Sequence, residues 1–193
     1  MGAMSYLMAQ IGRDAGKIKE KELWRSWGGC PSVQFFRWSN SEINSNTKKR
    51  YHLKMQTLFQ SDVNPDPTFE AVDPTSADEV YQAWTTYLIS QTRDIKKYSL
   101  LFKENMSYGF RRNLWGLKPY SIALLFLIMG ITYCYYCITA QSYNPISYNF
   151  LFFIAEGLLL ILILLWTLII TPKWIKITSF GYAERLLETI ETL

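Results

Sequence analysis

PYSIALLFLIMGITYCYYCITA (residues 119–140) and YNFLFFIAEGLLLILILLWTLIIT (residues 148–171) decide the fold class of this chain. The first run carries no charged residue, and the second carries only Glu156. A helix rises about 1.5 Å per residue, so roughly 20 apolar residues cross a hydrocarbon layer about 30 Å thick. Both runs are therefore long enough to span a membrane. The connector QSYNPIS, residues 141–147, contains the turn signal Asn144-Pro145, which predicts a two-helix transmembrane hairpin.

Composition excludes several classes of protein. The 193 residues are 49% hydrophobic, 16% aromatic and 19% charged, which is too apolar for a disordered chain. A net charge of +4 is too small and scattered for a dedicated nucleic-acid binder, so we expect no duplex nucleic acid as a partner. Three cysteines, two of them inside an apolar run, do not make a secreted disulfide scaffold.

Basic residues predict the orientation of the hairpin. They precede and follow the two runs but are absent from the connector, so both termini are expected in the cytoplasm. The cations are Lys103, Arg111, Arg112 and Lys118 on one side and Lys173, Lys176 and Arg185 on the other. We expect no cleaved signal peptide, because the first apolar run of spanning length begins at residue 119.

The polar remainder predicts an all-α cytoplasmic domain. Residues 1–75 form an N-terminal segment, with helices at 14–27 and 46–59, an aromatic run at 33–38 that fits a strand or a helical turn, and a solvated loop at 60–75. A long helix follows within residues 76–118, beginning at a capping box of Ser76 and Glu79. It gives way to an elbow at 105–118, at the level of the lipid headgroups. Residues 172–193 form an amphipathic helix that packs back on this domain.

Glu156 is the most informative single residue. A charge facing lipid at that depth costs on the order of 2.5 kcal/mol or more, so Glu156 must face protein or water, or be neutral. Polar residues recur at the same angular position along both runs, and several copies of the hairpin could close a ring with these stripes inward. The predicted pore-lining residues are Ser121, Thr132 and Thr139 in the first run and Asn149, Glu156, Thr167 and Thr171 in the second.

A second interpretation of the stripes stays open. The polar groups could instead meet as hydrogen bonds within one hairpin, with Glu156 neutral or paired to Tyr136 or another hydroxyl. In that case the chain is a membrane-anchored adaptor that conducts nothing.

Cations and aromatic residues are interleaved before the long helix, in a pattern that attracts phosphate and stacks bases. The candidate ligand-binding residues are Arg37, Trp38, Lys48, Lys49, Arg50 and Tyr51. A solvated helix face or a contact with anionic lipid would explain the same pattern.

Enzymatic chemistry is not expected. Residues 1–193 contain no nucleophile elbow, no glycine-rich phosphate loop and no H-E-x-x-H, and the lone His52 is expected on a solvated surface. Cys134 and Cys137 have C-x-x-C spacing, but inside an apolar helix they are interpreted as packing residues. We therefore expect no cofactor and no metal.

Residues 92–119, TRDIKKYSLLFKENMSYGFRRNLWGLKP, lead directly into the two apolar runs, and YAERLL at 182–187 closes the chain. This order of segments resembles the small bacterial two-transmembrane effectors found beside nucleotide second-messenger antiphage systems. The resemblance implies a homo-oligomer in the bacterial inner membrane, whose cytoplasmic part senses a nucleotide or oligonucleotide and whose spans permeabilise that membrane.

Overall fold

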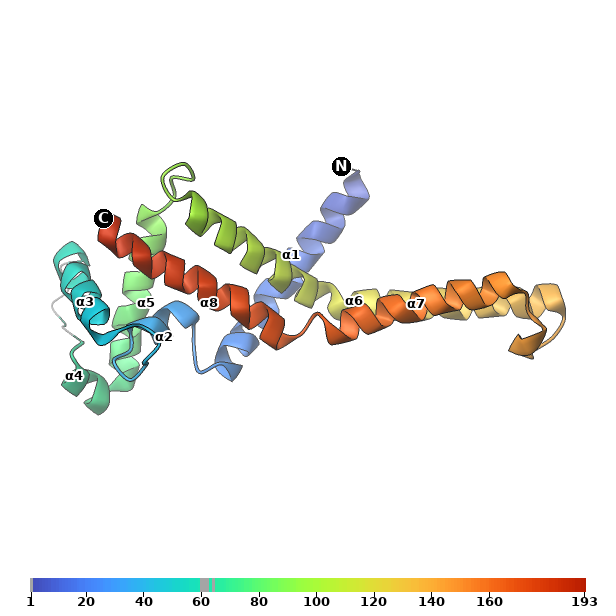
Figure 1. The fold of residues 1–193 in the computed structure, drawn as a ribbon, viewed down its shortest axis with the longest axis horizontal. Helices are drawn as coiled ribbons and strands as arrows, with labels where there is room; N and C mark the ends of the chain where they lie inside the picture. Colours follow the sequence, from blue (N-terminus) through green and yellow to red (C-terminus); the bar gives the residue numbers. More distant parts are fainter. Residues whose placement is uncertain (1, 60–62, 64) are drawn as a thin grey trace. The chain divides into compact units, whose positions relative to one another are not determined.

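The computed structural model describes residues 2–59, 63 and 65–193, and over these ranges it contains helices and no strand (Figure 1). The all-α prediction is therefore confirmed. The elements are α1 (Ala3–Ser26), α2 (Pro31–Phe36), α3 (Ser45–Phe59), α4 (Pro67–Val72), α5 (Pro74–Gln91), α6 (Ser99–Ala140), α7 (Phe150–Leu168) and α8 (Pro172–Glu188), with 3₁₀ turns at Pro145–Ser147 and Thr189–Thr192.

The chain divides into two compact units, which are described separately. Unit 1 contains the start of the chain up to Lys19 and the segment Arg111–Ile175. Unit 2 contains Glu20–Phe110 and Lys176–Leu193. Helices α1, α6 and α8 contribute residues to both units.

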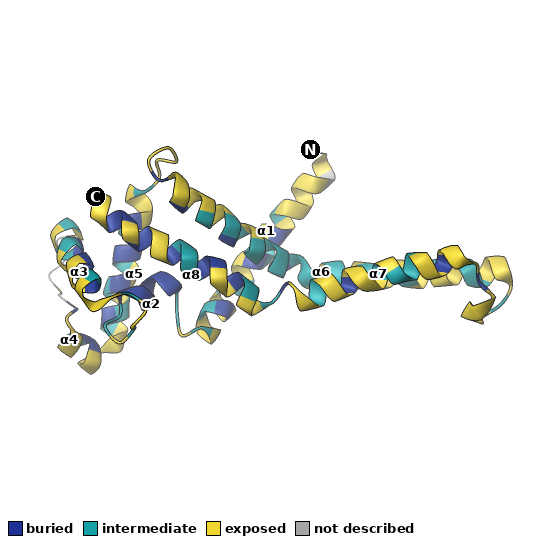
Figure 2. Ribbon diagram, in the orientation of Figure 1, coloured by how far each residue is buried: buried dark blue, intermediate teal, exposed yellow. Residues whose placement is uncertain are grey.

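In unit 1 the apolar part of α6 lies antiparallel to α7. Lys118 of α6 contacts Ile170 just after α7, and at the other end the ring of Tyr136 lies 5.1 Å from that of Phe152. Among the described residues, α6 and α7 are the two helices long and apolar enough to cross a membrane. Most of their apolar side chains are exposed in the single chain (Figure 2). They therefore do not resemble the core helices of a soluble protein.

Helix α6 differs from the sequence prediction. The long helix predicted to pass Phe102 ends at Gln91, and α6 begins at Ser99 after a turn in which Asp94 accepts the amides of Lys96 and Lys97. From there α6 is unbroken for 42 residues, so residues 105–118 form a helix and not an elbow. Pro119 removes only one backbone donor, and the helix continues on both sides of it.

Other boundaries are also shifted. Helix α5 begins at Pro74, because the Asp73 carboxylate accepts the Ser76 amide at 3.1 Å; the predicted capping box of Ser76 and Glu79 is therefore wrong. Helix α1 ends before Gly28 and Gly29, as predicted, but begins at Ala3. Residues 67–72 of the predicted solvated loop form α4, whereas residues 60–62 and 64 lie outside the described residues.

Unit 2 has one hydrophobic core. Helix α5 contributes the fully buried Tyr81, Trp84 and Leu88, which pack with Phe36 of α2 and Met55 of α3. The aromatic run at 33–38, which the sequence left undecided, is the short helix α2 and lies in this core. The predicted apolar stripe of the tail is confirmed, since the following residues are all buried in the same core: Ala183, Leu186, Leu187 and Ile190.

His52 lies inside the core and not on a solvated surface. Its side chain is 2% exposed, its ring lies 4.2 Å from that of Trp38, and its Nε2 is 2.8 Å from the carbonyl oxygen of Phe36. That carbonyl can only accept, so Nε2 carries the proton and donates it. Burial lowers the pKa of His52 from 6.5 to about 4. The basic residues around His52 in α3 suggested a solvated surface, and its burial was not predicted because its partners come from α2 and α5.

His52 should make stability depend on pH. The unfolded chain binds a proton on His52 below pH 6.5, and the folded chain does so only below about pH 4. Stability contributed by the neutral imidazole is thus present above pH 6.5 and is lost as pH falls toward 4, by about 3 kcal/mol. Thermal unfolding of the full chain in detergent should show this slope, and His52→Gln should flatten it. An unchanged slope in the variant would contradict the assignment.

Candidate functional site

The Glu156 carboxylate and the Thr132 hydroxyl form a polar contact between the two apolar helices. Glu156 lies six residues after the start of α7, and its Oε1 accepts a hydrogen bond from Thr132 of α6. The Thr132 hydroxyl also lies 3.0 Å from the carbonyl oxygen of Ile128 and 2.9 Å from that of Met129. A hydroxyl has one proton, so the carboxylate competes with these carbonyls for it. Both side chains are half-buried.

The other predicted pore-lining residues do not meet across the pair. Asn149 caps α7 by accepting the Phe152 amide at 3.2 Å, and Thr171 accepts the Trp174 amide at 3.3 Å. Thr139 and Thr167 donate to carbonyls of their own helices. Ser121 is half-buried in α6. In the single chain, the structure thus brings together only Thr132 and Glu156 of the predicted set, and a lining role for the set stays a prediction.

An aromatic cluster closes the connector end of the pair. The hydroxyl of Tyr148 donates to the Ser142 carbonyl at 2.8 Å, and its ring packs against Tyr136 and Phe152. Tyr136 therefore packs against aromatic rings, whereas the hydrogen bond to Glu156 comes from Thr132. Cys137 lies 3.0 Å from the Tyr148 hydroxyl, and Cys134 is exposed; both cysteines are free. The contact of Cys137 fits the predicted packing role, whereas for the exposed Cys134 that role stays a prediction.

At the opposite end of the α6–α7 pair, cations of α6 donate hydrogen bonds to backbone carbonyls. The Lys118 ammonium donates to the carbonyls of Thr167 at 3.1 Å and Ile170 at 2.8 Å, where α7 ends. Arg111 donates to the Trp174 carbonyl at 2.6 Å, and its guanidinium lies 4.5 Å from the centre of that indole ring. A cation at a helix C-terminus stabilises the exposed carbonyl ends of the helix dipole. The sequence analysis used Lys118 and Arg111 to predict the orientation of the hairpin, but it did not predict their hydrogen bonds to these carbonyls.

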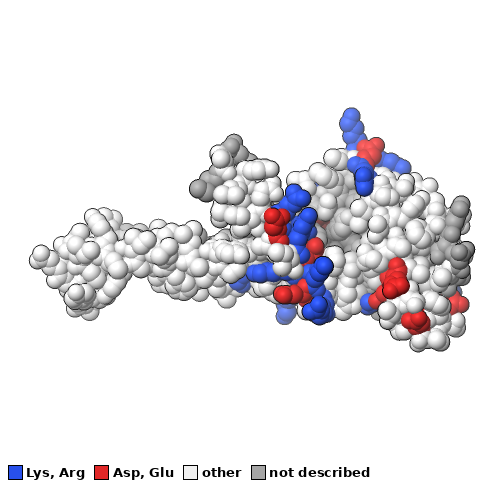
Figure 3. All heavy atoms as spheres, turned by 180° about the vertical axis from the view of Figure 1, so that it is seen from behind, with Lys and Arg blue, Asp and Glu red and all other residues white. Residues whose placement is uncertain are grey.

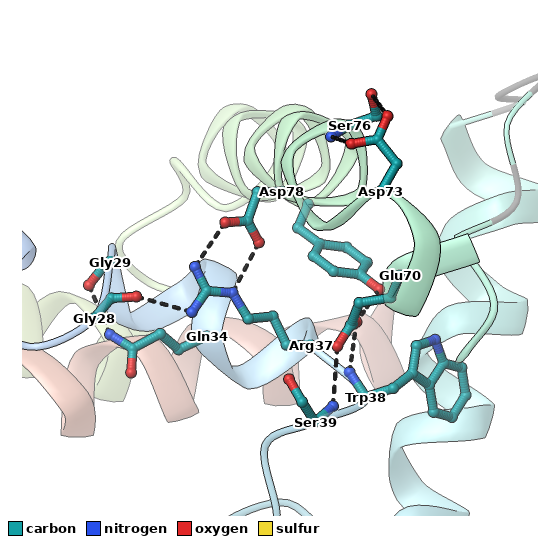
Figure 4. A network of polar contacts seen from close by, with 11 residues as sticks. Gly28, Gly29, Gln34, Arg37, Trp38, Ser39, Glu70, Asp73, Ser76 and Asp78 are labelled. Atoms are coloured by element: carbon teal, nitrogen blue, oxygen red, sulfur yellow. Dashed lines mark hydrogen bonds and ion pairs between the residues drawn. The ribbon is translucent and has the colours of Figure 1, made fainter. Parts of the chain in front are cut away.

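In unit 2, the predicted ligand-binding cations bind the chain's own acceptors. Arg37 Nε and one terminal nitrogen donate to the Asp78 carboxylate at 2.8 and 2.6 Å, and its other terminal nitrogen donates to the Gly28 carbonyl at 2.8 Å (Figure 4). Lys48 is 3% exposed and donates to the carbonyls of Arg37 and Asn40. These cations therefore hold the loop after α2 in place.

The remaining candidates are dispersed. Arg50 pairs with Glu191 at 2.7 Å, Tyr51 is buried in the core, and Lys49 is exposed. Trp38 donates from its indole nitrogen to the Pro65 carbonyl at 2.7 Å. Arg37 and Trp38 line an open groove of about 670 Å³, whereas Trp38 and Lys48 line another of about 370 Å³. The six residues therefore do not surround one cavity, and ligand binding by them stays a prediction.

Glu70 is a buried acid that sequence reasoning missed. Its carboxylate accepts the amides of Trp38 at 2.7 Å and Ser39 at 3.0 Å and the hydroxyl of Tyr81 at 2.8 Å (Figure 4). Burial alone would raise the pKa of Glu70, but these three hydrogen bonds outweigh it and hold the pKa below its usual value. Glu70 therefore orders the wall of the larger groove. Its place in an acidic, proline-rich segment gave no sign of burial.

Within the described ranges, no group of three His, Cys, Asp or Glu side chains is placed to hold a metal ion. Comparisons of the chain with protein-family models, with curated proteins and with solved structures find no match.

The contact between Thr132 and Glu156 predicts energetic coupling. Thr132→Val and Glu156→Leu each remove it, so the double variant should deviate from additivity by about 0.5–1.5 kcal/mol in thermal unfolding of the full chain in detergent. Thr139→Val is the matched control, since Thr139 donates only to carbonyls of α6 and should combine additively with Glu156→Leu. Additive effects for Thr132 would contradict the contact.

Proposed function

We propose that the chain is a membrane protein in which α6 and α7 form a transmembrane hairpin. Three observations support this: both helices have spanning length, their apolar side chains are exposed, and cations gather at one end of the pair. Under this proposal that end, both termini and unit 2 lie in the cytoplasm, which is the orientation that the basic residues favour. The inner membrane of a bacterium is the location implied by the resemblance described above.

The proposed activity is ion conduction through a channel built from several copies of the chain. Glu156 is the observation that supports it. It lies about 9 Å from the start of α7, at a depth where a charge facing lipid is costly. The side chain is half-buried, and its contact within the chain is one shared hydroxyl. Two helices cannot enclose a water-filled path. Further copies packed around the same face would surround the carboxylates with water and give a cation-preferring pore.

Unit 2 is proposed as the gate, responding to a nucleotide signal in antiphage defence. The groove beside Arg37 and Trp38 supports this, since a cation and an aromatic residue line it together with the acids Glu70 and Asp78. Because Asp78 holds the guanidinium, a phosphate would have to displace that carboxylate. Such an exchange would couple ligand binding to the packing of α2 on α5.

A second candidate function is a membrane-anchored adaptor that tethers a cytoplasmic partner and conducts nothing. The hydrogen bond from Thr132 favours it, because that bond provides Glu156 with a partner inside a single chain.

Ion flux through the full chain in proteoliposomes separates the two functions. The channel predicts a cation-selective current and an oligomeric particle in detergent. Glu156→Ala combined with Thr167→Ala should lower the permeability of potassium relative to chloride several-fold, because the charge of the ring is lost. The matched control is Glu79→Gln, an exposed acid of α5, which should leave selectivity unchanged.

Unchanged selectivity in the double variant would refute the lining assignment. A monomer or dimer without flux would instead establish the adaptor.

A further inference from the structure

The first part of α1 carries an apolar face that the described residues of unit 1 leave largely exposed. Leu7, Met8, Ile11 and Ile18 recur at helical spacing, so they project within about 100° of one another. Leu7 is 53% exposed and Ile18 is 75% exposed. Gln10, Arg13 and Lys17 lie on another face of the same helix. This segment is therefore amphipathic, with exposed apolar side chains on one side and Asp14 at the edge of that side.

A third face of α1, made of two glycines, fixes it to α6. A Cβ atom on Gly116 of α6 would lie 2.4 Å from the backbone nitrogen of Gly16 and 2.7 Å from the carbonyl oxygen of Gly12. A Cβ atom on Gly16 would lie 2.8 Å from the carbonyl oxygen of Arg112. The two backbones thus touch at a crossing that only glycine permits. The crossing lies one helical turn before Pro119, where the first proposed span begins.

Positive charge surrounds this crossing. Outside the apolar runs at 119–140 and 148–171, unit 1 contains one acid, Asp14, and seven cations: Arg13, Lys17, Lys19, Arg111, Arg112, Lys118 and Lys173. The ammonium groups of Lys19 and Lys118 lie 5.8 and 5.2 Å from the centre of the same Trp115 ring. On the face drawn in Figure 3, blue spheres of Lys and Arg gather together with red spheres of Asp and Glu at the base of the apolar arm, and neither colour is seen on the arm itself. A surface of this kind attracts phosphate groups.

We propose that residues 3–18 of α1 form an in-plane membrane helix, which lies in the anionic leaflet that the spans enter at Pro119. Its apolar face enters the acyl boundary, and the flanking lysines and arginines contact lipid phosphates. A second copy of the chain is a poorer occupant, because it would bring the same excess of cations. The inference rests on the membrane insertion proposed above, but not on conduction.

Spin labels test the depth of α1 in the full chain. In a variant with Cys30, Cys134 and Cys137 replaced by alanine, single cysteines at positions 7, 11 and 18, or at 10, 13 and 17, carry a nitroxide. Collision rates with oxygen and with a water-soluble nickel complex are then compared in vesicles of phosphatidylcholine with and without phosphatidylglycerol. Positions 7, 11 and 18 should favour oxygen, whereas positions 10, 13 and 17 should favour nickel. The difference in collision rates between the two sets of positions should be larger in the vesicles that contain phosphatidylglycerol.

Reference labels keep the two proposals distinguishable. A label at Leu158 of α7 reports membrane insertion, and one at the exposed Leu53 of α3 reports water. If position 158 favours oxygen but positions 7, 11 and 18 do not, the in-plane helix is refuted and the spans stand. If position 158 favours nickel, the insertion proposal itself fails. Spin–spin broadening between copies at position 11, independent of lipid composition, would assign the face to a second copy and overturn the lipid assignment.

The glycine crossing supplies a matched pair of variants. Gly116→Ala should separate α1 from α6 and remove the contrast between the two faces, without changing the label at position 158. Gly109→Ala, in the same helix, introduces a Cβ atom with nothing within 4 Å and should leave the contrast intact. Equal depth profiles for both variants would refute the role of the crossing.

Discussion

A carboxylate in an apolar helix is the constraint on which the proposed organisation of unit 1 depends. Glu156 accepts one hydrogen bond, from Thr132, whose single proton is also within reach of two backbone carbonyls. Removing a charge from water costs several kcal/mol unless other groups solvate it. One shared hydroxyl is a small compensation. The half-exposed face of the pair therefore needs either water or further protein around Glu156.

The two ends of the helix pair explain how it keeps Thr132 and Glu156 in register. Lys118 holds the carbonyls at the end of α7, and at the other end Tyr148 holds the connector and packs between aromatic rings. Ends fixed in this way leave little freedom for one helix to slide along the other. The same helix α6 continues for 42 residues and supplies Leu101 to the core of unit 2. One helix thus contributes to the packing of both units.

The sequence predicted what depends on local pattern. Apolar runs of spanning length, the short connector, helix α3 and the apolar stripe of the tail all follow from spacing and composition. The failures at buried polar residues share a cause, which is that long-range partners decided the outcome. His52 is buried by contacts with α2 and α5, and Glu70 by contacts with α5 and the loop after α2. Arg37 and Lys48 bind acceptors that local pattern does not indicate. The start of α1 was missed although Leu7, Met8 and Ile11 already have helical spacing.

Water accessibility at position 156 tests the central claim most directly. With the three native cysteines replaced, Glu156→Cys is treated with a membrane-impermeant thiol reagent in sealed vesicles, beside Leu158→Cys and Ile161→Cys. These two controls are exposed in the single chain and project from other faces of α7. The account predicts modification at position 156 and none at positions 158 and 161. Protection of position 156 to the same degree as positions 158 and 161 would contradict it.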